Sequence, residues 1–373
     1  MNADVVVIGA GTVGAAIGYG LAHRNVDVLV LDGSDRDYRA ATANFGLVWL
    51  QGKGMDMPAY QRLTRESVDL WPDFNAELSD VSAIDLQYER KGGLTLCLSP
   101  DEFEHQRATL TRLHNQLGSG DRDWEMLDRR ELDKLIPNVR FGAAVVGASF
   151  GRRDGHTNPL RLLLALHSGI VRKGGRLMGG VKVQRIQANG QGRFSIDCGD
   201  REITAGRVVI ASGLGSKELG GQVGLTVPIA PQRGQILVTE RLEAFLPFPM
   251  GELRQTRDGT VMIGSTEEDV GFNASTTTAA AAALSANAIR MIPALTDVKL
   301  VRHWAALRIL TPDSYPIYAE SQSHPGAFIA LCHSGVTLAA VHASALAEAI
   351  ASGHLGSSFD PFHQRRFDVS KAA

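Results

Sequence analysis

Cysteine is scarce in this sequence, which has three among 373 residues, at Cys97, Cys198 and Cys332. The three lie far apart and form no Cys-x-x-Cys pair, so this chain alone supplies neither a disulfide framework nor a four-cysteine cluster. We therefore predict no metal site. A chain without a disulfide framework is typical of a reducing compartment.

Long apolar runs and clustered charge are also absent. No stretch approaches the ~20 apolar residues of a membrane span, and the first residues lack the basic and apolar segments of a secretion signal. The net charge is −2 and no basic block occurs, which argues against nucleic acid or an anionic membrane as a partner. We expect a soluble, cytoplasmic protein that binds a small molecule.

The clearest pattern present lies in the first 32 residues. A β-branched run at 4–8 leads into a glycine-rich turn at 9–14, a helical pattern of small residues follows, and a second apolar run ends at Asp32. A strand, a glycine turn, a helix and a strand ending in an acid are typical of a dinucleotide-binding unit. The alternative is a glycine-rich turn in an α/β protein of another kind.

Each residue of this unit has its own task if a dinucleotide binds. Gly9 permits the tight turn, Gly11 lets the backbone approach a pyrophosphate, and Gly14 allows close packing of helix and strand. The helix N-terminus offers free N–H groups to the phosphates, and Asp32, eighteen residues after Gly14, would bind the ribose hydroxyls. The predicted cofactor-binding residues here are Gly9, Gly11, Thr12, Val13, Gly14 and Asp32.

Similar strands recur in the middle and at the end of the chain. A predicted strand over 176–184 contains Val183, and an apolar strand from 207 runs through Ala211 to Gly213. A third, at 326–331, leads through a turn at 332–338 into an apolar helix over 338–350. A buried strand that ends in small residues can pass close to a cofactor, although many parallel strands end in this way.

The remaining segments predict further helices and short strands. The length favours two domains, and two β-rich inserts separate the dinucleotide-type blocks. Helices are predicted at 57–78, 103–117, 129–135, 160–173 and 279–292, a β-hairpin at 86–90 and 94–98, and strands at 193–198, 201–204, 236–239, 260–264 and 298–304.

Four motifs together make the chain resemble the D-amino-acid oxidase superfamily of FAD-dependent flavoproteins, which includes glycine oxidase and the sarcosine oxidases. They are the glycine turn with its acid, the turn at Arg153–Pro159, the segment Trp304–Ile317 and the turn at Cys332–Leu338. The resemblance implies an α/β fold in which a discontinuous Rossmann-like FAD-binding domain accompanies a β-rich α+β substrate-binding domain. We assign 1–48, 146–225 and 305–373 to the first, and 49–145 and 226–304 to the second.

Within the superfamily, the segment His324–Leu338 looks most like the β subunits of heteromeric opine oxidases and D-hydroxyproline dehydrogenases. That resemblance implies an α subunit that carries an iron–sulfur cluster, allows a small γ subunit, and allows a second flavin, FMN, at the subunit interface. No histidine or cysteine stands out as a covalent tether, so we expect noncovalent FAD.

The implied reaction oxidises the C–N bond of a secondary amino acid, such as octopine, nopaline, hydroxyproline or proline, by hydride transfer from Cα to flavin N5. One alternative is a stand-alone glycine, D-amino-acid or sarcosine oxidase that makes hydrogen peroxide. Another is a non-catalytic assembly subunit with a flavin fold. A nicotinamide dehydrogenase is disfavoured because the dinucleotide strands are interrupted early and often.

Two residues are the candidates for catalysis. Arg308 lies in the segment that resembles the family's substrate-arginine motif, and a guanidinium suits a substrate carboxylate; the alternative is a structural arginine paired with Asp313. His333 precedes the helix expected at the flavin, where it could tune the flavin, accept the amine proton or simply pack.

Other residues are assigned by the same resemblance. Gly335, Val336 and Thr337 would present backbone N–H groups to the flavin, and Asn44 and Phe45 resemble the flavin-contacting loop. Tyr60, Tyr315 and Trp49 are candidates for the pocket, whereas His156 and Arg233 are given structural roles. The sequence departs from the family at three positions. Asp32 replaces a common Glu, and Ala306 and Ser314 replace two glycines. The replacement of the glycines is expected to tighten the pocket.

Overall fold

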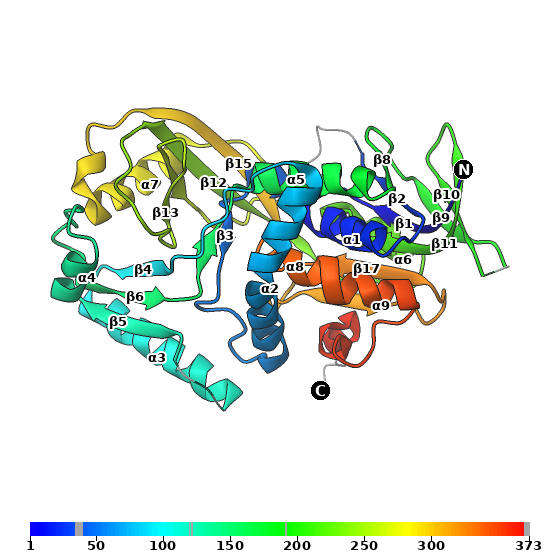
Figure 1. Cartoon of the computed structure of the whole chain (residues 1–373), viewed down its shortest axis with the longest axis horizontal. Helices are drawn as coiled ribbons and strands as arrows, with labels where there is room; N and C mark the ends of the chain where they lie inside the picture. The colour runs from blue at the N-terminus through cyan, green and yellow to red at the C-terminus, as the bar shows by residue number, and fades with distance from the viewer. Residues whose placement is uncertain (34–39, 119, 121, 191, 369–373) are drawn as a thin grey trace.

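The computed structural model describes residues 1–33, 40–118, 120, 122–190 and 192–368, and it has two parts lying side by side (Figure 1). One part is built on a largely parallel sheet, the other on two antiparallel sheets, and the helix α2 (Pro58–Ser82) stands between them. The predicted combination of a Rossmann-like α/β part with a β-rich α+β part is therefore confirmed.

The larger sheet has β1 (Asn2–Ile8) at its centre. Its strand order is β16-β17-β11-β1-β2-β8, with β16 antiparallel at one edge and β9 and β10 added antiparallel beside β11. The β-branched runs predicted from sequence form its buried middle. The other strands are β2 (Val28–Leu31), β8 (Arg176–Met178), β9 (Arg185–Ala188), β10 (Phe194–Asp197), β11 (Glu202–Ile210), β16 (Ile317–Glu320) and β17 (Ala327–Leu331).

Both faces of this sheet are covered, so successive residues of β1 enter different cores. Val5 and Val7 pack in one core with helices, while Val6 and Ile8 pack in the other. Small residues bring the helices close, since a Cβ on Gly20 would lie 2.1 Å from a backbone oxygen of η4. The covering helices are α1 (Thr12–His23), α5 (Pro159–Arg172), α6 (Ser216–Gly221), α8 (Ala339–Val341), η4 (His342–Leu346) and α9 (Ala347–Ser352).

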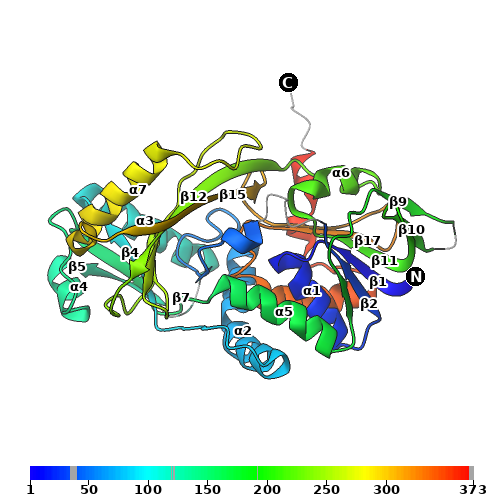
Figure 2. The same cartoon turned by 90° about the horizontal axis from the view of Figure 1, so that it is seen from above.

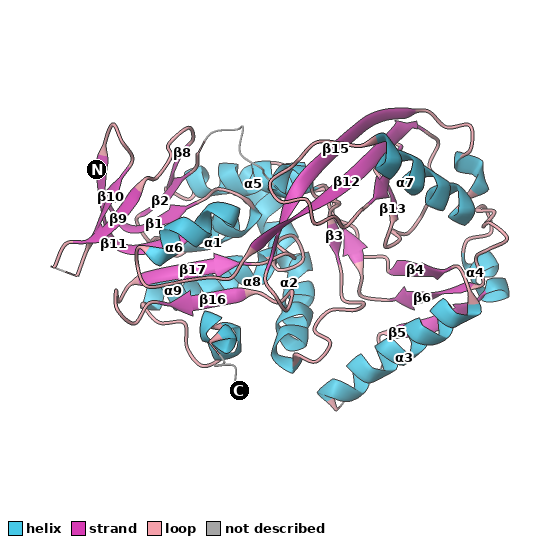
Figure 3. Cartoon of the chain, turned by 180° about the vertical axis from the view of Figure 1, so that it is seen from behind, coloured by secondary structure: helices cyan, strands magenta, loops and turns pink. Residues whose placement is uncertain are grey.

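The second part contains a four-stranded sheet of order β13-β14-β12-β15 and a three-stranded sheet of order β4-β6-β5, which share one apolar core. The two longest strands, β12 and β15, slant from this part toward the parallel sheet (Figures 2 and 3). Its elements are β4 (Gly93–Cys97), α3 (Pro100–Leu117), β5 (Trp124–Asp128), α4 (Arg129–Leu135), β6 (Gly147–Gly151), β12 (Ala230–Arg241), β13 (Leu253–Gln255), β14 (Thr260–Gly264), α7 (Thr278–Met291) and β15 (Leu300–Leu310).

Short elements complete the described chain. The two-residue strands β3 (Leu47–Val48) and β7 (Gly155–His156) pair with each other. The 3₁₀ turns are η1 (Ala40–Ala43), η2 (Gly213–Gly215), η3 (Pro293–Leu295), η5 (Asp360–Phe362) and η6 (Gln364–Phe367). A search of the described helices finds none with both the length and the apolar character of a bilayer span.

Two expectations for the strands are wrong. The predicted hairpin at 86–98 does not form, because β4 pairs with the distant β6 and Glu89 exchanges backbone hydrogen bonds with His156 at 2.9 Å. The strand predicted over 176–184 ends at Met178, before Gly179 and Gly180. The domain boundaries stay a prediction; residues 147–151 and 305–310 belong to the antiparallel sheets.

Candidate functional site

A cavity of about 980 Å³ lies where the parallel strands β1, β2, β11 and β17 end and the strands β12 and β15 approach them. Every predicted site residue except Gly14 lines it. The carboxyl ends of parallel strands are where α/β sheets bind ligands. The structure thus brings together residues from four distant stretches of the chain, and their individual roles remain predictions.

The three glycines of the first turn differ in what requires them. Gly9 has φ +107°, and a Cβ there would lie 2.4 Å from Ala211 O. A Cβ on Gly14 would lie 1.9 Å from Gly9 O, so Gly14 sits beneath the turn and not on the cavity wall. Gly11 has an ordinary φ of −67°, and its Cβ would meet only Ala41 Cβ at 3.7 Å. The chain itself needs Gly9 and Gly14, whereas only a ligand in the cavity would need Gly11.

The N-terminus of α1 faces the same space. Gly11 is its N-cap, no side chain caps the first turn, and no acidic residue lies in that turn. Thr12 and Val13 line the cavity there, while Asp32 lines it at the end of β2, with its carboxylate accepting a 3.0 Å hydrogen bond from Gly33 N–H. Free N–H groups and a positive dipole end favour a phosphate, and the acid is placed for ribose hydroxyls.

The turn at 332–337 is fixed from behind by α2. Thr337 O accepts hydrogen bonds from Ser67 Oγ at 2.7 Å and from Trp71 Nε1 at 3.0 Å. Thr337 Oγ1 accepts from Trp49 N at 3.2 Å, and a Cβ on Gly335 would lie 3.4 Å from Val13 Cγ2. These contacts hold residues 335–337 against the start of α1, along the cavity wall.

Arg308, on β15, is held by backbone and neutral side chains. Its guanidinium donates to Thr266 O at 2.8 Å, to Gln232 Oε1 at 3.3 Å and to Ser265 Oγ. Asp313 instead pairs with Arg366 at 2.7 Å, so the alternative pairing of Arg308 with Asp313 is wrong. No carboxylate of the described residues forms an ion pair with Arg308, which leaves a cation in the cavity for an anionic ligand.

His333 lies near Arg308 and Lys53. Burial, helped by these two cations, lowers the pKa of His333 to about 3, so the imidazole is neutral at pH 7. A base this weak is poorly suited to take a proton from an ammonium group. A neutral ring can still accept a hydrogen bond, and it places no further positive charge beside a reacting amine.

Sequence reasoning missed Lys53, which lines the cavity and donates to Ser334 Oγ at 3.0 Å. Tyr60 OH donates to the same oxygen at 3.0 Å. The loop at 52–54 carries no motif that marks the lysine. Of the three pocket candidates named from the sequence, Trp49 lines the cavity. Tyr60 and Tyr315 do not line it and instead contact each other, with ring centres 5.5 Å apart.

The two residues given structural roles have structural contacts. Arg233 forms a 2.6 Å ion pair with Glu268, and the side chain of Arg233 is buried. His156 Nδ1 lies 3.3 Å from Arg254 Nη1, and neither His156 nor Arg233 lines the cavity. Burial lowers the pKa of His156 to about 4 and that of Arg254 to about 10.

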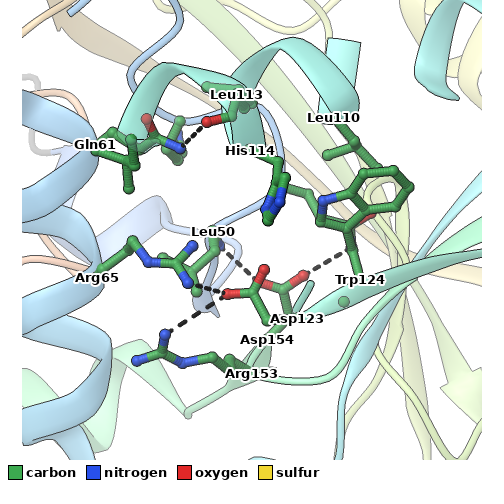
Figure 4. A pocket seen from close by; sticks show the side chains of 14 residues that line it. Leu50, Gln61, Arg65, Leu110, Leu113, His114, Asp123, Trp124, Arg153 and Asp154 are labelled. Carbon is green, nitrogen blue, oxygen red and sulfur yellow. Dashed lines mark hydrogen bonds and ion pairs between the residues drawn. The ribbon is translucent and has the colours of Figure 1, made fainter. Parts of the chain in front are cut away.

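A second, small pocket of about 40 Å³ lies beside Lys53, between α2, α3 and β5 (Figure 4). Asp154 is fully buried there and accepts hydrogen bonds from Leu50 N at 2.6 Å and Gln51 Nε2 at 2.7 Å. Arg65 pairs with Asp123 at 2.7 Å (Figure 4). The space suits one or two waters, so the large cavity is the candidate ligand site.

Comparison with known proteins agrees with this geometry. The family model described as FAD dependent oxidoreductase matches residues 4–349. The chain is 39% identical over 369 residues to an opine oxidase subunit of Rhizobium meliloti, covering 99% of each chain. It is 40% identical over 370 residues to the corresponding opine oxidase subunit of Agrobacterium tumefaciens (strain Ach5), again covering 99% of each.

Among solved structures, glycine oxidase from Geobacillus kaustophilus superposes with a TM-score of 0.87 at 24% identity, covering 98% of this chain and 99% of that one. The residues present fit FAD: Gly11 leaves open space, α1 offers an uncapped N-terminus, and Asp32 ends β2. The chain therefore belongs to the family of FAD-dependent oxidoreductases.

Proposed function

We propose that this chain oxidises the C–N bond of a secondary amino acid, an opine such as octopine or nopaline or else hydroxyproline or proline, as the catalytic subunit of a heteromeric dehydrogenase. Bound FAD supplies a hydride acceptor at its N5. The single observation that carries the proposal is the guanidinium of Arg308, which forms no ion pair with a described carboxylate and lies in the same cavity as the dinucleotide cradle.

Arg308 would bind the substrate carboxylate. Thr266 O and Gln232 already occupy Nη1, and Ser265 Oγ accepts from Nη2, so the side chain is oriented before the substrate arrives. Burial lowers the pKa of Arg308 because it disfavours the charged guanidinium. A bound substrate carboxylate would offset this effect by pairing with the charge. A guanidinium binds a carboxylate through two parallel hydrogen bonds and thereby fixes the adjacent Cα.

Two further groups would act around the reacting carbon. The neutral His333 would accept a hydrogen bond from the substrate nitrogen without adding charge beside the cationic product. The backbone N–H groups of 335–337, held in place through Thr337, would stabilise the negative charge that the flavin gains on reduction. A pure assembly subunit has no need of a carboxylate-binding arginine, which disfavours that alternative.

The heteromeric state is proposed from the relatives, whose names designate each of them as one subunit of an opine oxidase. The proposed partner is an α subunit that carries an iron–sulfur cluster and removes the electrons, with FMN at the interface and a small γ subunit in the complex. A cytoplasmic location and noncovalent attachment of FAD belong to the same proposal.

The test is an anaerobic visible spectrum of the FAD-loaded protein, titrated with octopine, nopaline, D- and L-hydroxyproline, proline, sarcosine, glycine and D-alanine. Bleaching by an opine or a cyclic imino acid is the expected result. Bleaching only by glycine or D-alanine, with peroxide formed in air, would support a stand-alone oxidase. A bound flavin that no amine bleaches, with the partner subunits present, would contradict the proposal.

A further inference from the structure

Burial lowers the pKa of Lys53, an effect that Cys332 and Asp154 oppose. Lys53 lies at the wall shared by the large cavity and the small pocket. Its Nζ donates to Ser334 Oγ at 3.0 Å. Tyr60 OH donates to the same oxygen at 3.0 Å and fixes the position of the Ser334 side chain. The bond from Lys53 to this oxygen therefore directs the lysine toward the turn at 332–337.

The charge of Lys53 is not neutralised within the described chain. Asp154 acts electrostatically on Lys53, but its two oxygens accept hydrogen bonds from Leu50 N–H (Figure 4) and from Gln51 Nε2. No carboxylate of the described residues forms an ion pair with Lys53. An ammonium group held away from water without a counter-ion is costly, and an anion that arrives with a ligand would offset that cost.

Two such cations flank one residue of the site. Lys53 and Arg308 both act on the imidazole of His333, and all three side chains line the large cavity. Glu267 also lines it and lies near Arg308. The part of the cavity around His333 therefore presents two positive groups that come from different elements, the loop after β3 and the strand β15.

We propose that Lys53 is a second carboxylate-binding residue of the substrate site, and that the substrate is a secondary amine with a carboxylate on each of its two nitrogen substituents. This inference rests on the proposed function. It favours opines and other iminodicarboxylates over proline and hydroxyproline, which carry one carboxylate. Arg308 would bind one carboxylate and Lys53 the other, with the nitrogen between them beside His333.

The first experiment needs no variant. Thiodiglycolate and (methylthio)acetate are thioether analogues with two carboxylates and one, and they offer no amine to oxidise. Their dissociation constants for the FAD-loaded protein are measured by perturbation of the flavin spectrum. We expect thiodiglycolate to bind roughly 10- to 100-fold more tightly, the range for one hydrogen bond to a charged group. Equal affinities would overturn the inference.

The second experiment compares Lys53→Met with Lys134→Met, which removes an exposed lysine of α4 and serves as the matched control. The substrates are iminodiacetate and sarcosine, secondary amines with two carboxylates and one. In Lys53→Met we expect KM for iminodiacetate to rise about tenfold or more, with KM for sarcosine unchanged. Lys53→Arg should recover part of the loss, because it restores the charge.

The outcomes separate this inference from the proposed function. If neither these two amines nor any opine or cyclic imino acid bleaches the flavin in the unaltered protein, the proposed function fails, while the thioether titration still decides whether two carboxylates are bound. If both amines bleach it and Lys53→Met raises both KM values equally, the proposed function stands and Lys53 has no second-carboxylate role. If Lys53→Met loses its flavin, the comparison of the two thioethers in the unaltered protein decides.

Discussion

At the scale of single residues, the turn at 9–14 shows that one glycine can be required by the chain and its neighbour by a ligand. Gly14 has no room for a Cβ, since Gly9 O would lie 1.9 Å away. Gly11 has room and ordinary backbone angles. A pattern of three glycines does not reveal this difference. It depends on which atoms the folded chain places beside each glycine, Gly9 O beside Gly14 and Ala41 of η1 beside Gly11.

This difference predicts opposite defects for two substitutions. Gly11→Val should leave a folded chain that no longer binds FAD, because the side chain would fill the space left for the pyrophosphate. Gly14→Ala should destabilise the chain itself, by roughly 1–3 kcal/mol or more, because the helix must move away from Gly9 in the turn. Urea unfolding of the apoprotein and absorbance near 450 nm separate the two. A yellow, active Gly11→Val protein would contradict the role given to Gly11.

Arg308 carries the prediction for substrate binding. Arg308→Ala should keep the flavin and lower kcat/KM for carboxylate substrates by roughly 100-fold or more, the loss expected for a bidentate charged contact. Arg308→Lys keeps the charge and loses the fork, so an intermediate loss is expected. Steady-state kinetics measure both variants. Loss of the flavin in Arg308→Ala would move the residue to a structural or cofactor role.

At the scale of elements, local patterns located the strands that are buried along their whole length. The strands β2 and β17 are apolar throughout and β1 is apolar from Val5 onward, and the helices α1 and α5 follow from small-residue and amphipathic patterns. The hairpin at 86–98 failed because the partner of β4 is β6, at least 50 residues away in sequence. Lys53 was missed for the same reason, since its partner Ser334 is 281 residues distant.

The helix α2 gives an element-scale prediction, because it holds the turn at 332–337 through Ser67 and Trp71. Ser67→Ala removes one of two hydrogen bonds to Thr337 O, so the dissociation constant for FAD should rise about 2- to 10-fold. Ser82→Ala, on the same helix, removes a bond to Leu78 O within the helix and is the matched control. Equal FAD affinities in the two variants would show that Ser67 does not position the turn.

At the scale of the whole molecule, several buried groups have pKa values far from those of an unfolded chain. Burial lowers the pKa of His156 to about 4 and those of His333 and His342 to about 3, and it raises the pKa of Asp154 to about 7. The histidines stabilise the fold above pH ~6.5 and lose that contribution as the pH falls toward their folded values. Asp154 acts in the opposite direction, because its contribution is complete below pH ~4 and is lost as the pH rises through 7.

These four groups together predict acid lability. Of these four groups, between pH 6 and 5 the three histidines bind protons in the unfolded chain, while only Asp154 binds one in the folded chain. The difference of two protons lowers the free energy of unfolding by about 3 kcal/mol per pH unit. Urea unfolding at pH 7, 6 and 5 measures this slope. His342→Gln should reduce it by about 1.4 kcal/mol per unit, whereas the exposed His105→Gln should not change it. A slope that His342→Gln leaves unaltered would show that His342 takes up its proton without unfolding.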